Sequence, residues 1–154
     1  MTENTVTVNT DASFCPHTKA AGYAFWISCN GGRYKKHGVL KGVKNPGEAE
    51  MHAIANALHY LYSSPYTKDQ VFSKIWINSD CLDALSRIQD ESEGTEAERF
   101  IQIRLALLLE DKGELLCRHV RAHRHTRTPR NYVNDWCDTM AKKSMRIRRK
   151  ELRE

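Results

Sequence analysis

The first forty residues contain three stretches that predict strands, at positions 6–9, 23–29 and 33–40. In the first of them apolar and polar side chains alternate and β-branched types are frequent. Residues 30–32, with the sequence Asn-Gly-Gly, separate the second stretch from the third and tolerate the positive φ angles of a tight turn. The pattern predicts three antiparallel strands, the first ending near Asp11.

Beyond Pro46 the spacing of apolar residues changes to that of a helix. In the helix expected from about residue 47 to 63, these residues recur at intervals of three and four: Met51, Ile54, Leu58 and Leu61. Pro46 near the first turn and Pro65 past the end are typical helix boundaries. The later segments predict, in order, a buried strand at 71–78, helices at 82–88 and 95–113, a strand at 115–120 and a helix at 134–147.

The resulting order of elements is β-β-β-α-β-α-α-β-α. It predicts an α/β fold with a mixed five-stranded sheet, built from a three-stranded meander and two parallel crossovers, with helices on both faces. The chain has 154 residues, which is a usual size for one domain. We expect a single domain with its core at about 5–145 and a basic C-terminal tail at 146–154.

Composition narrows the class of protein. Hydrophobic residues make up 40% and charged residues 28%, as in a folded globular domain rather than a disordered or fibrous chain. The longest apolar run, at 105–109, is too short to span a bilayer, and the amino terminus lacks the pattern of a signal peptide. The five cysteines form no C-x-x-C pair, which favours reduced thiols. We expect a cytoplasmic monomer without membrane partners.

Charge is distributed unevenly along the chain, whose net charge is +5. Residues 1–117 carry 12 basic and 15 acidic side chains, whereas residues 118–154 carry 12 basic and only 4 acidic ones. A basic C-terminal surface favours a polyanionic partner such as nucleic acid, although solvated basic tails share this composition.

Four acidic residues stand where this topology could bring them together. Asp11 ends the first strand and Asp80 the fourth, and parallel neighbouring strands would place both at the switch point where open sheets bind ligands. Glu50 lies beside the apolar stripe of the first helix, and Asp138 lies in the last helix. Taken singly, each acid could be a turn residue, a helix cap or a solvated side chain. Taken together, clustered carboxylates repel one another, and hard divalent cations relieve that repulsion.

Five short motifs occur in order along the chain. They are T-D-x-S at 10–13, A-E-x-x-A-I at 49–54, S-D at 79–80, A-H at 122–123 and N-x-x-C-D at 134–138. Together they resemble the type 1 ribonuclease H family over roughly residues 5–145. The resemblance implies the ribonuclease H-like fold, two bound Mg²⁺ ions, for which Mn²⁺ can substitute, and hydrolysis of the RNA strand of RNA–DNA hybrids.

The resemblance also assigns roles to residues of this chain. The carboxylates that match the catalytic and metal-binding acids of the family are Asp11, Glu50, Asp80 and Asp138. Asp135 competes for the last position, but the N-x-x-C-D pattern favours Asp138. His123 matches a mobile-loop histidine that assists proton transfer or product release, and His125 is the alternative.

Nucleic-acid contacts are expected from five residues near these motifs: Ser13, Asn45, Arg121, Arg124 and Asn134. Two departures from the family pattern bear on binding. The interval at 90–98 is acidic where some members carry a basic helix, so binding must rely on the basic loop, the tail or the lysines of the first half. The family often has an asparagine four residues before this glutamate, whereas here Asn45 lies five residues before Glu50 and Pro46 holds the matching place.

Two other functions compete with that of a hybrid-specific nuclease. The same fold and metals could act on structured DNA or double-stranded RNA, or the chain could bind nucleic acid without catalysis. Retention of all four acids argues against a non-catalytic binder, because such a protein would gain from losing their repulsion. A zinc site is disfavoured because its ligands would be split between a strand and a loop without a closing knuckle: Cys117, His119, His123 and His125.

Overall fold

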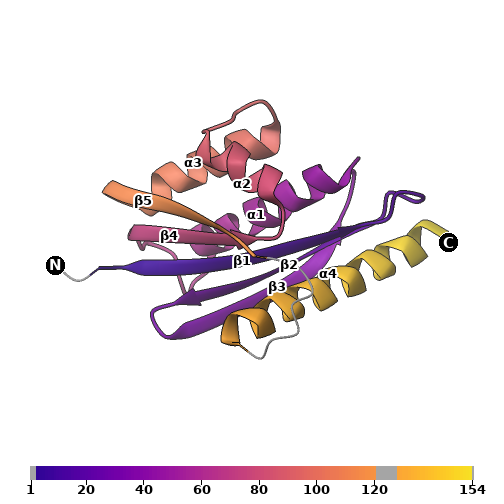
Figure 1. Cartoon of the computed structure of the whole chain (residues 1–154), viewed down its shortest axis with the longest axis horizontal. Coiled ribbons are helices and arrows are strands. Elements are labelled where there is room, and N and C mark those ends of the chain that lie inside the picture. Colours follow the sequence, from indigo (N-terminus) through magenta and orange to yellow (C-terminus); the bar gives the residue numbers. More distant parts are fainter. Residues whose placement is uncertain (1–2, 121–127, 154) are drawn as a thin grey trace.

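The computed structural model of the chain describes residues 3–120 and 128–153. They form a five-stranded sheet with the strand order β3-β2-β1-β4-β5 and helices on both faces (Figure 1). In chain order the elements are β1 (Thr5–Phe14), β2 (Ala21–Cys29), β3 (Gly32–Leu40), α1 (Pro46–Ser63), β4 (Phe72–Ser79), α2 (Leu82–Gln89), α3 (Glu96–Leu108), β5 (Leu109–His119) and α4 (Pro129–Arg153). The predicted element order and the mixed sheet are confirmed.

Strand β1 lies at the centre of the sheet and joins its antiparallel half to its parallel half. It pairs antiparallel with β2, which in turn pairs antiparallel with β3. On its other side β1 pairs parallel with β4, and β4 pairs parallel with β5. After β1 the chain continues to β2, toward one edge of the sheet, and after β4 it continues to β5, toward the other edge. The carboxyl ends of β1 and β4 therefore form a topological switch point.

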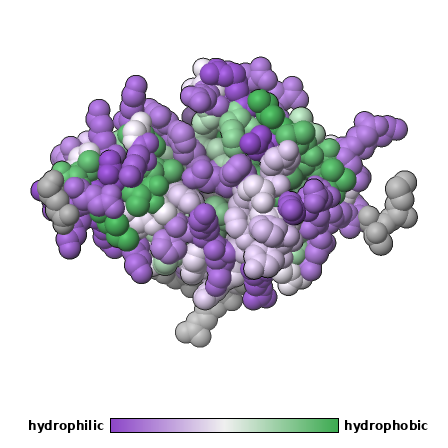
Figure 2. Space-filling model, turned by 180° about the vertical axis from the view of Figure 1, so that it is seen from behind, coloured by the Kyte–Doolittle hydropathy of each residue, from purple (hydrophilic) through white to green (hydrophobic). Residues whose placement is uncertain are grey.

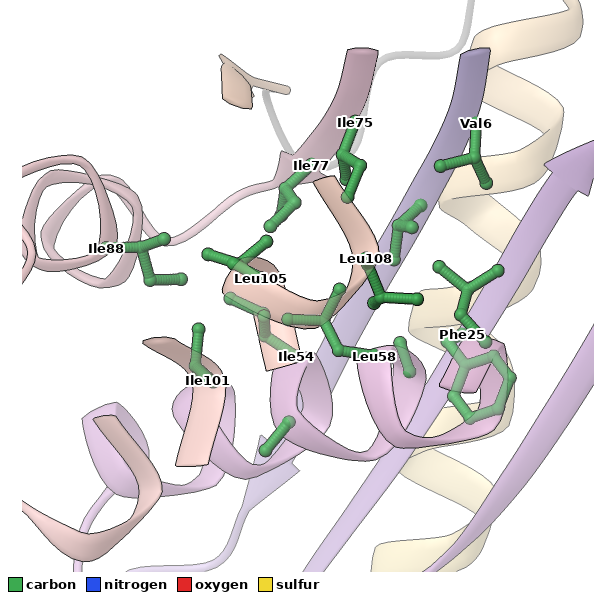
Figure 3. Close-up of a cluster of buried hydrophobic side chains, with 14 of the residues drawn as sticks. Val6, Phe25, Ile54, Leu58, Ile75, Ile77, Ile88, Ile101, Leu105 and Leu108 are labelled. Atoms are coloured by element: carbon green, nitrogen blue, oxygen red, sulfur yellow. The ribbon is translucent and has the colours of Figure 1, made fainter. Parts of the chain in front are cut away.

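The main hydrophobic core lies between the sheet and the layer that contains α1, α2 and α3 (Figure 3). Ile54 and Leu58 of α1 are fully buried against Phe25 of β2 and Ile77 of β4, and Leu105 of α3 joins them. The apolar stripe predicted for α1 faces this core. Each such side chain contributes about 1.5–3 kcal/mol when it is removed from water, so the layer holds α1 firmly on the sheet.

Helix α4 packs on the opposite face, over β1, β2 and β3. The approach to β2 is close because Gly22 has no side chain: an added Cβ would lie 2.4 Å from the backbone nitrogen of Met145 and 2.6 Å from the carbonyl oxygen of Ala141. Trp26 and Cys137 are buried in the same contact. Small residues on both elements therefore set the depth at which α4 lies on the sheet.

The predicted boundary between the third helix and the fifth strand is wrong. Helix α3 ends at Leu108 rather than near Gly113, and β5 begins at the next residue. Residues 110–113 bulge from this strand, because its register against β4 shifts between Phe72 and Lys74. The Asp-Lys-Gly sequence in this segment therefore marks a bulge inside a strand and not the C-terminus of a helix.

The last helix is longer at both ends than the predicted span of 134–147. At its start the hydroxyl of Thr128 accepts a hydrogen bond of 3.2 Å from the backbone N–H of Asn131, and a proline follows Thr128 at the first helical position. At its end the expected tail at 146–154 continues the helix as far as residue 153. Its Arg, Lys, Leu and Glu residues favour helix, and Arg148 pairs with the acid three residues further on.

The surface is mainly polar. Figure 2 shows the face turned away from the viewer in Figure 1, where hydrophilic side chains dominate and hydrophobic ones form separate patches. The large hydrophobic side chains that are exposed include Tyr62, Tyr66, Ile103 and Leu107. Within the described residues no helix is both long and apolar enough to cross a membrane.

Candidate active site

Three of the predicted carboxylates meet at the switch point of the sheet. Asp11 comes from the carboxyl half of β1, Glu50 from the second turn of α1, and Asp80 directly follows β4. One carboxylate oxygen of each lies within 4.8 Å of the other two. Asp11 is buried, and Glu50 and Asp80 are half-buried. The parallel pairing of β1 and β4, with α1 packed across them, is what brings together residues that are far apart in the sequence.

The fourth predicted carboxylate, Asp138, approaches the cluster from α4. It adjoins Asp11 closely enough to raise the pKa of that side chain by charge repulsion and by a hydrogen bond. The Nζ atom of Lys142, one turn further along the helix, lies 3.0 Å from Oδ2 of Asp138. Asp135, the competitor from the sequence, is exposed and is not among the neighbours that perturb Asp11. The geometry therefore favours Asp138.

Electrostatic strain is concentrated in this cluster. Burial, together with repulsion from Asp80 and Asp138, raises the pKa of Asp11 from 3.8 to about 8, although the backbone N–H of Ala12 donates a hydrogen bond of 2.9 Å to Asp11. Burial, together with repulsion from Asp11 and Asp80, likewise raises the pKa of Glu50 from 4.5 to about 9. These carboxyl groups therefore resist ionisation together unless a positive charge joins them.

The arrangement of oxygen atoms fits a divalent cation. The Oε2 atom of Glu50 is buried without a hydrogen-bond partner among the described residues, so one strong acceptor of the cluster is unsatisfied. Carboxylate oxygens are the ligands preferred by hard cations such as Mg²⁺ and Mn²⁺. Asp11, Glu50 and Asp80, with Asp138 beside them, are accordingly the residues that could hold metal ions.

Asp80 could have been a helix cap, and Glu50 could have been a solvated residue of its helix; their surroundings in the structure test both possibilities. The N-cap residue of α2 is Cys81 rather than Asp80, and the side chain of Cys81 makes no capping hydrogen bond. Glu48, the other acid at the start of α1, points away from the cluster and accepts a hydrogen bond of 3.3 Å from the backbone N–H of Lys44. Glu50 is therefore the acid of this helix that reaches the site.

Two buried asparagines that were not anticipated from the sequence lie next to the cluster along β1 and β4. The side-chain N–H of Asn78 donates to Oδ1 of Asn9 at 2.8 Å, and the side-chain N–H of Asn9 donates to the carbonyl of Trp26 at 3.2 Å. Asn9 and Asn78 are direct partners in the parallel pairing of β1 and β4. The signal was present as a repeated N-x-D pattern, in which each asparagine precedes Asp11 or Asp80 by two residues.

Comparison with known proteins agrees with this geometry. The family model for RNase H matches residues 3–146 of the chain. The chain belongs to the RNase H family. It is therefore a ribonuclease H enzyme, a nuclease of the class that acts on RNA–DNA hybrids. No match is found among the curated proteins.

Solved structures of other ribonucleases H share the fold. RNase H1 from the halophilic archaeon Halobacterium salinarum is 16% identical, with a TM-score of 0.63 over 92% of this chain and 98% of that one. The N-terminal RNase H domain of rv2228c from Mycobacterium tuberculosis is 11% identical, with a TM-score of 0.66 over 96% of this chain and 98% of that one. At these identities the likeness concerns the architecture alone.

The residues predicted to contact nucleic acid surround the active site of this RNase H unevenly. Ser13 is half-buried in β1, two residues beyond Asp11, and Asn134 is half-buried in α4, four residues before Asp138. Asn45 serves as the N-cap of α1, where its side-chain oxygen accepts a hydrogen bond of 2.8 Å from the backbone N–H of the residue three positions on. The remaining predicted residues lie outside the described part of the chain: Arg121, His123, Arg124 and His125.

The structure gives no support to a zinc site in this RNase H. Among the described residues, the group of potential metal ligands that lie close together is the carboxylate trio. Cys117 is half-buried in β5, where burial raises the pKa of its thiol to about 11, and this disfavours the thiolate that zinc requires. His119, also in β5, lies with Nε2 at 3.1 Å from the carbonyl oxygen of Asp80.

Proposed function

We propose that this ribonuclease H hydrolyses the RNA strand of RNA–DNA hybrids with two divalent metal ions, normally Mg²⁺, for which Mn²⁺ can substitute. The observation that carries the proposal is the convergence of Asp11, Glu50 and Asp80 within 4.8 Å, with raised pKa values for Asp11 and Glu50. A chain that places so much mutual repulsion in one site gains from cations that neutralise it. We expect it to act as a cytoplasmic, monomeric, single-domain protein.

The carboxylates would hold the metal ions, and their environment would set the ions' affinity. The pKa values of Asp11 and Glu50 are raised, so binding of cations would be coupled to release of their protons. Asp138 lies at the border of the cluster and is held between Asp11 and Lys142. When bound, a pair of ions would supply an activated water and neutralise charge on the leaving oxygen of the phosphodiester.

Residues around the carboxylates would bind and orient the hybrid. Ser13 and Asn134 flank the cluster in β1 and α4 and would donate hydrogen bonds to the sugar-phosphate backbone. Asn45 uses its side-chain oxygen as a helix cap, which leaves its N–H₂ group as the donor toward substrate. Arg121 and Arg124 would contact phosphates, and His123 would assist proton transfer or product release, with His125 as the alternative.

A substrate comparison with matched variants tests the proposal. The wild-type chain should cleave a labelled RNA–DNA hybrid in Mg²⁺ and release RNA fragments, while equivalent double-stranded RNA and DNA remain intact. Asp80→Asn should lower this activity by several orders of magnitude, whereas Asp135→Asn, the same change at an exposed acid, should leave it unchanged. Faster cleavage of double-stranded RNA or structured DNA, or full activity of Asp80→Asn, would overturn the assignment.

A further inference from the structure

A row of basic side chains continues from the active site along α4. In the half of the helix at 142–153, seven residues are basic and one is acidic. Four of the basic residues lie within about 80° of Asp138 around the helix axis, at about 100° per residue. These four residues, here named the basic row, are Lys142, Arg146, Arg149 and Arg153. The side of α4 that presents a carboxylate to the active site thus becomes cationic one turn later.

The basic row is oriented by the packing of the rest of the helix. Ala141, Ser144 and Met145 are buried on the sheet side of α4, which leaves the row along the flank and the outer surface. Met145 packs with Cys15 and Ala20 at the turn between β1 and β2. In Figure 1 the yellow end of α4 accordingly lies at the same end of the molecule as this turn. The row therefore leads from the carboxylates past the β1–β2 turn.

The four members of the row differ in whether a described residue neutralises their charge. Lys142 pairs with Asp138, and Arg149 donates to the thiol of Cys15. Arg146 and Arg153 are exposed, and no carboxylate among the described residues lies within ion-pair distance of either. Exposed, unpaired guanidinium groups in a row are suited to a ligand with regularly spaced negative charges.

The opposite side of the molecule has the opposite charge. Residues 82–99, which include α2 and the start of α3, carry six acidic and two basic side chains. This segment would repel a phosphate backbone, whereas the basic row would attract one. The charge asymmetry therefore selects the side of the active site toward which a nucleic-acid duplex extends.

We propose that the basic row is a phosphate-binding arm, which holds the backbone of the duplex where it runs away from the bond to be cleaved. The proposal rests on the proposed function in one respect, the placement of the scissile bond at the carboxylates. From Asp138 to Arg153 the helix rises about 22 Å, which matches about seven phosphates of one strand. The RNase H family match ends at residue 146, so Arg149 and Arg153 lie beyond the part of the chain that the family defines.

A matched pair of double variants tests the arm. Arg146→Gln/Arg153→Gln removes two exposed charges of the row, and Lys143→Gln/Lys150→Gln removes two exposed charges about 120–140° away on the same helix. Both doubles are built in the full chain with Asp80→Asn, so that binding is measured without turnover. The probes are hybrids of about 24 and about 8 base pairs and a DNA duplex of about 24, titrated from about 50 to 200 mM salt.

The arginine double variant should weaken binding of the long hybrid about tenfold at low salt. It should also reduce the slope of log affinity against log salt by about 2, since each phosphate contact contributes about 0.9 to that slope. The lysine double should change the slope by less than about 0.5. The loss should be similar for the DNA duplex, because the arm contacts phosphates alone, and smaller for the short hybrid, which does not reach residue 153.

Other results would overturn the arm. If the two double variants gave equal slopes of log affinity against log salt, the helix would contribute only its overall charge. If the arginine double variant lost equal affinity for short and long hybrids, the row would not follow the duplex. These results are independent of catalysis, because binding is read in a variant that does not turn over. Failure of the wild-type chain to cleave hybrids would overturn the proposed function and would still leave the arm measurable.

Discussion

Replacement of Asp11 by asparagine should stabilise the metal-free protein while abolishing its activity. Asp11→Asn removes one negative charge from the buried cluster and keeps the shape of the side chain. The amide oxygen of the new residue can still accept the 2.9 Å hydrogen bond from the N–H of Ala12, and its N–H₂ group can donate to a neighbouring carboxylate. The substitution therefore relieves repulsion without opening a cavity or leaving a donor unsatisfied.

The size of this effect follows from the pKa of Asp11. Because the folded protein raises that pKa from 3.8 to about 8, the folded state holds a proton that the unfolded chain releases, and stability falls as the pH rises between these values. Each pKa unit corresponds to about 1.4 kcal/mol, so the protonation that folding imposes on Asp11 costs the apoprotein about 4 kcal/mol at pH 7 and about 2 kcal/mol at pH 5. For a chain of this length, 4 kcal/mol corresponds to a rise in Tm of about 10 °C.

Thermal denaturation in EDTA at pH 5 and pH 7 measures this difference. Asp11→Asn should melt about 10 °C above wild type at pH 7, and this advantage should be about halved at pH 5. When Mg²⁺ replaces EDTA at a hundred times its dissociation constant, it should stabilise wild type by about 2.7 kcal/mol and raise its Tm, and it should raise the Tm of the variant less. Asp135→Asn, at an exposed position, is the control and should shift neither curve.

A variant that melts at or below wild type at pH 7 would refute this reasoning, because it would show that Asp11 stabilises the fold rather than straining it. A stability difference that stayed constant from pH 5 to pH 7 would refute the assigned cause, since only a titrating carboxylate gives the pH dependence. Retention of hybrid cleavage would separate Asp11 from the metal site altogether.

Three further predictions concern the surroundings of the site. Gly22→Ala should lower the unfolding free energy by about 1–3 kcal/mol and reduce cleavage, because its Cβ would lie 2.4 Å from the backbone of α4. Chemical denaturation measures the first effect, and a hybrid-cleavage assay measures the second. Asn78→Ala should cost about 1–3 kcal/mol by leaving Asn9 unsatisfied, and should weaken the Tm response to Mg²⁺. Hydrogen bonds lower the pKa of the Cys15 thiol to about 6, and the largest contributions come from the hydroxyl and backbone N–H of Thr18. The alkylation rate of Cys15 should therefore level off above pH 7, and Thr18→Ala should move that plateau to higher pH.

The fold could be predicted largely because its apolar pattern is strong where packing is strong. The apolar stripe of α1 and the buried strand β4 both face the main core, so hydrophobic spacing alone located them. The boundary at Leu108 was not predictable in the same way, because an apolar run passes from helix to strand without interruption. There, pairing of Phe72 with Leu109 decides the conformation, and pairing partners far away in the sequence leave no local signal.

The start of α4 illustrates the reverse case, in which a local signal existed and was outweighed. Thr128 and the proline after it form a good helix start, but the surrounding basic residues resemble a loop. The end of the helix was missed because charged residues without apolar spacing show no amphipathic pattern. Continuation to residue 153 rests on helix propensity and on the pair formed by Arg148, which act without a buried face.

The acidic residues of the candidate site could be predicted from the sequence, but their burial and the hydrogen bonds around them could not. The predicted strand ends located Asp11 and Asp80, although the predicted end of the first strand is wrong, because β1 pairs with β2 as far as Phe14. The degree of burial, which dominates the pKa of Asp11, depends on how α1 and α4 close over the sheet. The asparagine pair behind the acids also needs the register of β1 and β4, since Asn9 and Asn78 are 69 positions apart. Tertiary pairing converts a repeated N-x-D pattern into one polar network.

Helix α4 links the acidic and basic parts of this molecule through a single packing arrangement. Its small residues at 137 and 141 lie against β2, and this depth brings Asp138 to the edge of the carboxylate cluster. The same depth fixes the direction of the basic row, because both lie on one rigid helix. A shift of α4 away from Gly22 would therefore displace the metal site and the phosphate-binding arm together, whereas charge substitutions at Arg146 and Arg153 would change only the arm. Substrate affinity and metal affinity should accordingly fall in parallel in Gly22→Ala and separate in the arginine double variant.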